Sequence, residues 1–329
     1  MTKTALITGI TGQDGYYLSR LLLGREYRVI GLVPPARLGS VAKLGELVEQ
    51  VEIYPVDLTS ADALMEAVYS LKPDEIYNLA APSFVPASWE DPLGTLDLIT
   101  GTATRLLKAT RQLGLSTRFY QASSSEILGD VRSCPQTAET PFRPTNPYGA
   151  AKLHAHWTMV HHRERYGLFA CSGILYNHES PRRPPQFVTR KISLAAAAIK
   201  LGKRDRLYIG NLAAKRDWGF AGDHVDAMWR MLQADEPQDY VIGTGVLHTV
   251  QDLVSTAFHC VDLDWEKYVE TDPLLVREDE HFQLMANPEK AKANLDWEPQ
   301  VSFEQLIDTM VKADLERLEA GTVSPVGVS

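Results

Sequence analysis

The N-terminal half of the chain alternates between short apolar runs and longer amphipathic segments. Short apolar runs predict buried strands, whereas apolar positions that recur every three or four residues predict helices. Strands that alternate with helices indicate a parallel sheet with right-handed crossovers, the doubly wound α/β (Rossmann) fold. The predicted strands cover residues 5–8, 28–33, 51–56, 75–79 and 118–121, and helices are predicted at 61–71 and from about 93 to 113.

The second half of the chain is less regular. Helices are predicted to end near residue 166 and to cover 187–201, strands at 169–175 and 240–243, and mostly helix from residue 249 onward. We therefore expect a dinucleotide-binding domain and a smaller C-terminal substrate lobe whose segments are interleaved along the chain. The expected bounds are 1–176 for the first domain, with sheet-completing segments near 214–247, then 177–319 for the lobe and 320–329 for a disordered tail.

Composition and charge narrow the classes of function. The 329 residues carry a formal net charge of −9, which argues against a nucleic-acid-binding surface. Cys134, Cys171 and Cys260 are too few and too widely spaced for a disulfide framework or a metal site. No apolar run is long enough for a membrane span, and no signal peptide precedes the first strand. We expect a cytoplasmic protein without a metal, a nucleic-acid partner or a membrane partner.

A glycine-rich loop follows the first predicted strand. Its sequence is Gly9-Ile10-Thr11-Gly12-Gln13-Asp14-Gly15, and an amphipathic helix comes directly after it. Glycines in a strand–loop–helix context permit close approach of a pyrophosphate to the backbone, and the helix N-terminus supplies unpaired N–H groups. A glycine-rich turn that binds nothing is the alternative interpretation.

Tyr148 and Lys152 are candidates for proton transfer. Their spacing places both side chains on one face of a helix, one turn apart. A tyrosine with a pKa of about 10 is a poor base, and a neighbouring ammonium favours the phenolate. The pair suits removal of a proton from a sugar hydroxyl while hydride leaves the same carbon. An ordinary amphipathic helix remains the alternative.

The residues after the second predicted strand bear on cofactor choice. Pro34, Pro35 and Arg37 stand where an acidic residue would bind the ribose of NAD. Arg37 is suited to the 2′-phosphate of NADP. A solvated loop arginine is an equally good interpretation, so NADP is expected and NAD is not excluded.

Several motifs together resemble the GDP-mannose 4,6-dehydratases, a family within the extended short-chain dehydrogenase/reductases. The resemblance covers the chain from Gly9 to about Trp297. Besides the glycine loop, it is carried by Gln121-Ala122-Ser123-Ser124-Ser125-Glu126, by Pro147-Tyr148, by the run from Gly173 to Arg183, by Phe187 to Lys191 and by Lys215-Arg216-Asp217-Trp218-Gly219.

The resemblance implies a lyase that converts GDP-mannose to GDP-4-keto-6-deoxymannose. Tyr148 would take the proton from the 4-hydroxyl, and Lys152 would hold the nicotinamide ribose and lower the tyrosine pKa. Ser124 would hydrogen-bond the 4-oxygen. Glu126 would remove the proton from carbon 5 and assist loss of the 6-hydroxyl as water. A 4-ketone acidifies that proton, so a carboxylate within reach is a competent base.

The resemblance also implies contacts to the ligands. The expected cofactor-binding residues are Gly9, Thr11, Gly12, Gln13, Asp14, Gly15, Arg37, Asp57, Leu58, Leu79, Ala80, Ala81, Ser83, Tyr148, Lys152, His178 and Arg183. The expected substrate-binding residues are Ser88, Ser124, Glu126, Asn177, Val188, Lys191, Arg216, Arg277 and Glu280.

Three alternatives to this prediction stay open on the sequence alone. They are a dehydratase for a different nucleotide hexose, a 4-keto reductase, and a non-catalytic cofactor-binding protein of the same fold. The presence of Glu126 argues against the reductase, which needs no base at carbon 5. Family members are dimers or tetramers, so a homodimer or homotetramer is expected.

Overall fold

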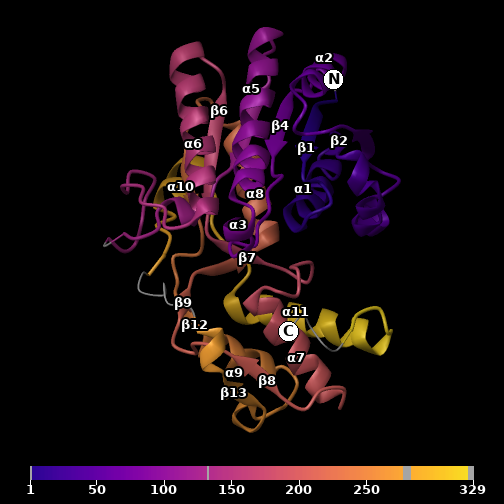
Figure 1. The fold of residues 1–329 in the computed structure, drawn as a ribbon, viewed down its shortest axis with the longest axis vertical. Coiled ribbons are helices and arrows are strands. Elements are labelled where there is room, and N and C mark those ends of the chain that lie inside the picture. The colour runs from indigo at the N-terminus through magenta and orange to yellow at the C-terminus, as the bar shows by residue number, and fades with distance from the viewer. Residues whose placement is uncertain (1, 132, 277–282, 325–329) are drawn as a thin grey trace.

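The computed structural model describes residues 2–131, 133–276 and 283–324. A sheet with helices around it forms one lobe, drawn at the top of Figure 1, and a mostly helical lobe lies below it. Within the described residues, no helix is both long and apolar enough to span a lipid bilayer.

A seven-stranded parallel sheet forms the centre of the first lobe, in the order β3-β2-β1-β4-β5-β6-β11. This order confirms the predicted doubly wound fold. Crossovers leave β1 toward both edges, so the strand order reverses between β1 and β4. The strands are β1 (Thr4–Thr8), β2 (Arg28–Val33), β3 (Glu52–Pro55), β4 (Glu75–Asn78), β5 (Arg118–Ala122), β6 (Ala170–Leu175) and β11 (Tyr240–Ile242).

Helices cover both faces of the sheet. Strand residues alternate between the faces, so Ala5 and Ile7 of β1 are buried in one core while Leu6 is buried in the other. The first face is covered by α1 (Gln13–Leu23), α8 (Ala221–Gln233) and α10 (Glu289–Leu295), and the second by α2 (Ala61–Leu71), α5 (Thr102–Gln112) and α6 (Pro147–Tyr166).

The second lobe packs α7 (Val188–Lys200) and α9 (Val250–His259) against α11 (Phe303–Glu319). Two small sheets complete it: β8 (Leu207–Ile209) pairs with β13 (Val269–Thr271), and β9 (Lys215–Arg216) pairs with β12 (His248–Thr249). The chain enters and leaves this lobe several times, because α8, β11 and α10 all return to the first lobe. At the junction, β7 (Asn177–Glu179) pairs with β10 (Trp218–Phe220).

Two segments differ from the sequence-based prediction. The expected helix from 93 to 113 is divided into α4 (Pro92–Leu96), a π-helical turn (Asp97–Gly101) and α5, and Thr100 in that turn donates to the Ala151 carbonyl of α6. The segment after β2 forms a 3-10 helix, Pro35–Leu47, interrupted at Gly45, whose φ is +59°. The remaining short elements are α3 (Ala87–Glu90) and 3-10 turns at Ser125–Ile127, Trp265–Lys267 and Pro273–Leu275.

A buried ion pair anchors the junction to the second lobe. Arg190 of α7 lies 2.6 Å from a carboxylate oxygen of Asp314 on α11, which also accepts a hydrogen bond from Ser193. The Arg190 guanidinium also donates to the carbonyls of Pro181 and Arg183 at 2.7 and 3.0 Å. The buried charges are therefore paired and hydrogen-bonded, which offsets their desolvation. This pair fixes the turn that follows β7.

Candidate active site

The glycine loop at the carboxyl end of β1 lies against the segment that follows β4. Gly9 has a φ of +73°, and a Cβ atom there would lie 2.9 Å from the Ala80 nitrogen. The Thr8 hydroxyl accepts hydrogen bonds from the backbone N–H groups of Leu79 and Ala80 at 3.0 and 3.1 Å. Only glycine fits this contact, so Gly9 brings Leu79 and Ala80 to the loop as expected for a cofactor site.

The N-terminus of α1 fits the pyrophosphate of a dinucleotide. Gly12 is the N-cap and has no side chain to satisfy the first N–H groups of the helix. A Cβ atom at Gly15 would lie 2.4 Å from the Ile10 carbonyl oxygen, so this helix also needs glycine to pack on the loop. Free N–H groups and the helix dipole make this end of α1 a suitable anion site.

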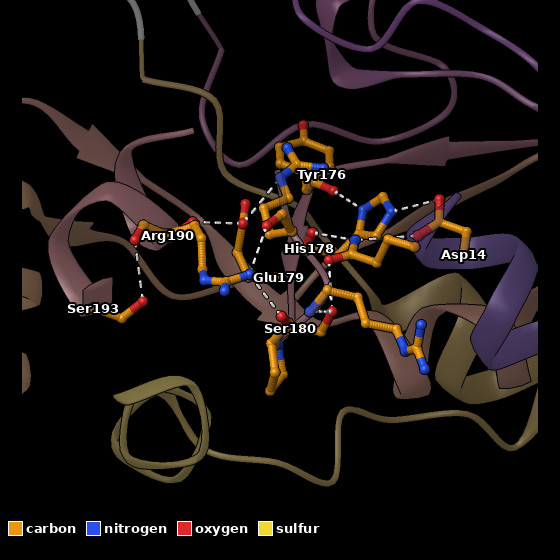
Figure 2. Close-up of polar contacts among 12 residues, drawn as sticks. Asp14, Tyr176, His178, Glu179, Ser180, Arg190 and Ser193 are labelled. Atoms are coloured by element: carbon orange, nitrogen blue, oxygen red, sulfur yellow. Dashed lines mark hydrogen bonds and ion pairs between the residues drawn. The ribbon is translucent and has the colours of Figure 1, made fainter. Parts of the chain in front are cut away.

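Asp14 and His178 form an ion pair between α1 and β7 (Figure 2). The His178 Nε2 atom lies 3.0 Å from an Asp14 carboxylate oxygen, and Nδ1 lies 2.7 Å from the Tyr176 carbonyl oxygen. Both neighbours are acceptors, so both ring nitrogens must donate and the imidazole is protonated. Burial alone would lower the pKa of His178, but the charge of Asp14 reverses that effect and leaves it raised. Burial, the largest single effect, would raise the carboxylate pKa of Asp14, but the charge and hydrogen bond of His178, the hydrogen bond from Gln13 and the charge of Arg183 together lower it.

Gln13 reinforces this contact. Its amide nitrogen donates to the His178 carbonyl at 3.0 Å, and its amide oxygen accepts from the Ser180 hydroxyl at 2.8 Å. The first turn of α1 is therefore bound to β7 by side chains on two successive residues. Gln13, Asp14 and His178 are expected to contact the cofactor, and in the structure their polar atoms also contact one another and hold the glycine loop in place.

Arg183 pairs with a buried carboxylate, and its charge also acts on Tyr148. Its Nε atom lies 3.0 Å from an Oε2 atom of Glu179, which also accepts from the Thr189 hydroxyl at 2.6 Å. The guanidinium carbon lies 3.7 Å from the centre of the Phe187 ring. Burial raises the pKa of Glu179 despite the charge of Arg183. The expected cofactor residue Arg183 is thus held in position by a residue that the sequence analysis did not select.

Tyr148, Ser124 and Lys152 are brought together as predicted. Tyr148 and Lys152 are buried on α6, and Ser124 follows β5 and is close enough to the Tyr148 hydroxyl to lower the pKa of Tyr148. The Lys152 amine donates to the Ala122 carbonyl at 2.7 Å and lies 5.6 Å from the centre of the Tyr148 ring.

The expected effect of Lys152 on Tyr148 is not met in this structure. Burial raises the pKa of Tyr148, against smaller lowering effects from the hydrogen bond with Ser124 and the charge of Arg183. Burial also lowers the pKa of Lys152 to about 8. The dry surroundings of both groups disfavour their charged forms, and the amine points to a backbone carbonyl. Neither the raised pKa of Tyr148 nor the lowered pKa of Lys152 can be read from the four-residue spacing, because both result from burial.

Glu126 opens onto a small pocket at the junction of the lobes. Its Oε2 atom accepts a hydrogen bond from the Asn146 amide at 2.7 Å. The pocket lies between β7, β9 and the 3-10 turn that carries Glu126, so Asn177 and Arg216, expected to bind the substrate, share it with this carboxylate. Its lining residues are Ser125, Glu126, Tyr176, Asn177, Arg216, Asp217 and Leu284.

The other expected substrate residues lie on α7 or beyond it. Val188 begins α7 and packs against the core of the second lobe, and Lys191 lies one turn further along. Burial, followed by the charge of Arg204, lowers the pKa of Lys191. Arg277 and Glu280 fall outside the described residues.

Several expected ligand residues are not gathered at this site. Leu58 is buried in the core beneath α2 and α5, because the strand end turns its side chain inward. Ser88 is also buried: its hydroxyl donates to the Val85 carbonyl and accepts from the Tyr148 backbone N–H at 3.3 Å, so it supports α6. Among the other expected ligand residues, Arg37, Asp57 and Ser83 are exposed and Ala81 is partly exposed. The Thr11 hydroxyl accepts a hydrogen bond from the Ser40 hydroxyl.

Sequence reasoning missed two polar residues that shape the pocket. Asp217 is buried and accepts hydrogen bonds from the backbone N–H groups of Thr244, Gly245 and Ala286 at 2.9, 2.9 and 3.1 Å. The charged run Lys215-Arg216-Asp217 indicated a polar site here. The hydrogen-bond partners of Asp217 are distant in sequence, so its role could not be read from the run. Asn146 precedes the helix that carries Tyr148, and its contact with Glu126 joins residues 20 positions apart, which a local pattern does not reveal.

Known proteins resemble this chain over nearly its whole length. The family model described as GDP-mannose 4,6 dehydratase matches residues 6–310. GDP-mannose 4,6 dehydratase 2 of Arabidopsis thaliana is 47% identical over 95% of this chain and 87% of that protein. The human GDP-mannose 4,6 dehydratase is 43% identical over 95% of this chain and 92% of that protein.

Solved structures share the fold. A dTDP-glucose 4,6-dehydratase from Streptomyces venezuelae, with NAD and TYD bound, has a TM-score of 0.85 at 23% identity and covers 98% of this chain and 99% of its own. RMD from Pseudomonas aeruginosa, complexed with NADPH, has a TM-score of 0.83 at 22% identity, over 96% and 100% of the two chains.

The parallel sheet, the glycine loop and the Tyr148–Lys152 pair define an extended short-chain dehydrogenase/reductase. Within that class, the chain belongs to the GDP-mannose 4,6-dehydratase family, because the family model and the relatives match nearly all of it. The resemblance seen in the sequence is thereby confirmed.

We predict that His178→Gln removes a pH dependence of stability that the wild type shows. A group whose pKa is raised on folding stabilises the fold while it is protonated, and this contribution is lost as the pH rises through the folded-state pKa. As the pH rises from about 6 to about 9, the urea midpoint of the wild type should fall relative to that of the variant. Glutamine keeps a hydrogen-bond donor but carries no charge that titrates in this range.

His259→Gln is the matched control, since His259 is exposed on α9. The urea midpoint of this control should change with pH as steeply as that of the wild type. Parallel midpoint curves for the wild type and His178→Gln would contradict a charged His178. At the acid end the contribution of the pair falls again as Asp14 is protonated, because its pKa is lowered on folding.

Proposed function

We propose that this protein converts GDP-mannose to GDP-4-keto-6-deoxymannose by oxidation at carbon 4, loss of water across carbons 5 and 6, and reduction at carbon 6. The observation that carries the proposal is the juxtaposition of Tyr148 and Ser124 with Glu126, because the Asn146 that precedes Tyr148 also binds the Glu126 carboxylate. Oxidation at carbon 4 needs only Tyr148 and Ser124, whereas elimination of water also needs the Glu126 carboxylate.

Tyr148 is the proposed acceptor of the 4-hydroxyl proton. The side chain of Ser124 lies near its phenol and lowers the pKa of Tyr148, so both groups are proposed to hydrogen-bond the 4-oxygen of the sugar. The raised pKa of buried Tyr148 means that ionisation needs additional positive charge in the site. Lys152 supplies part of that charge when it is protonated, and its bond to the Ala122 carbonyl fixes its direction.

A nicotinamide cofactor fits the glycine loop, where Gly9, Gly12 and Gly15 leave room for a backbone-bound pyrophosphate. When bound, it would take the hydride from carbon 4, return it to carbon 6 and bring positive charge into the site. The protein would hold it through the N-terminus of α1 and the backbone of Leu79 and Ala80.

Glu126 is the proposed base at carbon 5. Once carbon 4 is a ketone, the neighbouring C–H bond is acidic enough for a carboxylate to break. The proton moves to Glu126, which passes it to the 6-hydroxyl so that this group leaves as water. After hydride has returned to carbon 6, a proton from solvent replaces the one lost at carbon 5. Asn177 and Arg216 share the Glu126 pocket and are proposed to bind the nucleotide sugar, with Lys191 and Val188 on α7.

We predict that Glu126→Gln lowers kcat by about 10³-fold, because glutamine cannot accept the carbon 5 proton. Product formation with GDP-mannose in deuterated water, followed by mass spectrometry, measures both turnover and deuterium at carbon 5. Glu139→Gln is a matched control, since Glu139 is an exposed carboxylate outside the pocket. Wild-type deuterium incorporation in the Glu126 variant would remove it from this role.

We propose NADP as the cofactor, on the grounds that no acidic residue ends β2 and that Arg37 is exposed just beyond it. The Arg37 guanidinium has no hydrogen bond or ion pair with any other described residue. We predict that Arg37→Ala weakens NADP binding about tenfold and leaves NAD binding unchanged, as expected when a charged hydrogen bond to the 2′-phosphate is lost. Calorimetric titration with both cofactors tests this, and equal effects on the two would contradict it.

We propose a homodimer formed across α4 and α6, which pack side by side. Leu93 and Leu96 of α4 are 77% and 42% exposed, and Trp157 of α6 is 44% exposed, an apolar surface typical of an interface. Leu93→Glu should shift the protein toward monomer in light scattering, whereas Tyr69→Glu, an exposed position on α2, should not. A monomeric wild type at micromolar concentration would contradict the dimer.

A further inference from the structure

Asn146 links the helix that carries Tyr148 to the carboxylate of Glu126. As the N-cap of α6, it accepts a hydrogen bond from the Gly149 backbone N–H at its Oδ1 atom, at 2.8 Å. Its Nδ2 atom donates to the Glu126 Oε2 atom at 2.7 Å. One amide therefore contacts both structural units of the proposed chemistry.

The orientation of this amide is fixed by its partners. The Gly149 N–H group is a donor and can bond only to the amide oxygen, while the Glu126 carboxylate is an acceptor and can bond only to the NH₂ group. A flipped amide would lose both hydrogen bonds. No described residue donates to the second oxygen of Glu126, Oε1, so that atom remains available to a ligand in the pocket.

The backbone of α6 also contacts the backbone of the turn that carries Glu126. The Glu126 side chain is therefore the part of this turn that can still change conformation. A Cβ atom at Gly149 would lie 2.6 Å from the Glu126 carbonyl oxygen, so α6 packs directly on the turn. The Arg143 N–H donates to the Ile127 carbonyl at 3.0 Å, and the Glu126 N–H donates to the Ser124 hydroxyl at 3.2 Å. The chain path of Glu126 is set by these contacts, while Asn146 sets its side-chain rotamer.

We propose that Asn146 is a positioning residue for the elimination step: it holds one oxygen of Glu126 so that the other faces carbon 5 of the sugar. The proposal rests on the proposed function of Glu126 as the base. A carboxylate on a flexible side chain samples several rotamers, and one fixed hydrogen bond selects among them. Asn146 does not contact Tyr148 or Ser124 through its amide, so oxidation at carbon 4 should not depend on this bond.

Asn146→Ser separates the two functions of the residue. Serine is as good an N-cap as asparagine, so α6 should begin normally. The serine hydroxyl is too short to replace the amide at Glu126 while it caps the helix. We expect kcat to fall about 10- to 100-fold with little change in KM, and deuterium incorporation at carbon 5 to slow by the same factor.

A second signal distinguishes positioning from a general loss of structure. If only elimination is slowed, oxidation still occurs, and reduced nicotinamide should accumulate transiently when the variant is mixed with GDP-mannose. Stopped-flow absorbance of the reduced nicotinamide measures this. Ser302→Ala is the matched control, because Ser302 caps α11 far along the chain. It should lower the melting temperature by a few degrees and give the wild-type absorbance trace.

Asn146→Asp provides an independent variant that also keeps the cap. It places a carboxylate beside Glu126, and two adjacent carboxylates share a proton until the pH is high enough to ionise both. Turnover of this variant should therefore need a higher pH than the wild type, a change that loss of a helix cap would not produce.

The outcomes separate this proposal from the function on which it rests. Slow elimination with accumulated reduced nicotinamide in Asn146→Ser supports positioning. Wild-type turnover and deuterium incorporation in both Asn146 variants, with Glu126→Gln inactive, would overturn the role of Asn146 and leave Glu126 as the base. Equal slowing of oxidation and elimination would also overturn it. Wild-type turnover and deuterium incorporation by Glu126→Gln would instead refute the role of Glu126 as the base, on which the proposal for Asn146 rests.

Discussion

The shared direction of seven strands is the constraint from which the site follows. Parallel strands end at one edge of a sheet, so β1, β4, β5 and β6 deliver their following residues to the same place. Gly9, Ala80, Ser124 and Asn177 come from four separate segments and meet there. The hydroxyl of Thr8 then binds two of these segments together, because it accepts N–H groups from the chain that follows β4.

Buried charge pairs connect this edge to the second lobe. Asp14 pairs with His178 (Figure 2), and Arg190 pairs with Asp314, so the two pairs lie on a path from α1 to α11. Each pair offsets a desolvation cost that a lone charge would impose. A movement of the second lobe would disturb these contacts, so the position of the glycine loop and the position of the lobe are coupled through β7.

Burial disfavours the charged forms of the two groups that are proposed to act in catalysis. The low polarity around Tyr148 and Lys152 disfavours phenolate and ammonium alike. The same surroundings strengthen the effect of any charge that a ligand brings.

The sequence by itself determined the sheet, the glycine loop and the tyrosine–lysine pair, because these depend on local periodicity and short spacings. It also indicated the family, since the motifs of the second half are specific. The tertiary structure alone decided that Asp14 pairs with His178, that Leu58 and Ser88 are buried supports, and that Asn146 binds Glu126. Such contacts join residues far apart in the chain, and pKa values depend on burial, so neither can be read from a local pattern.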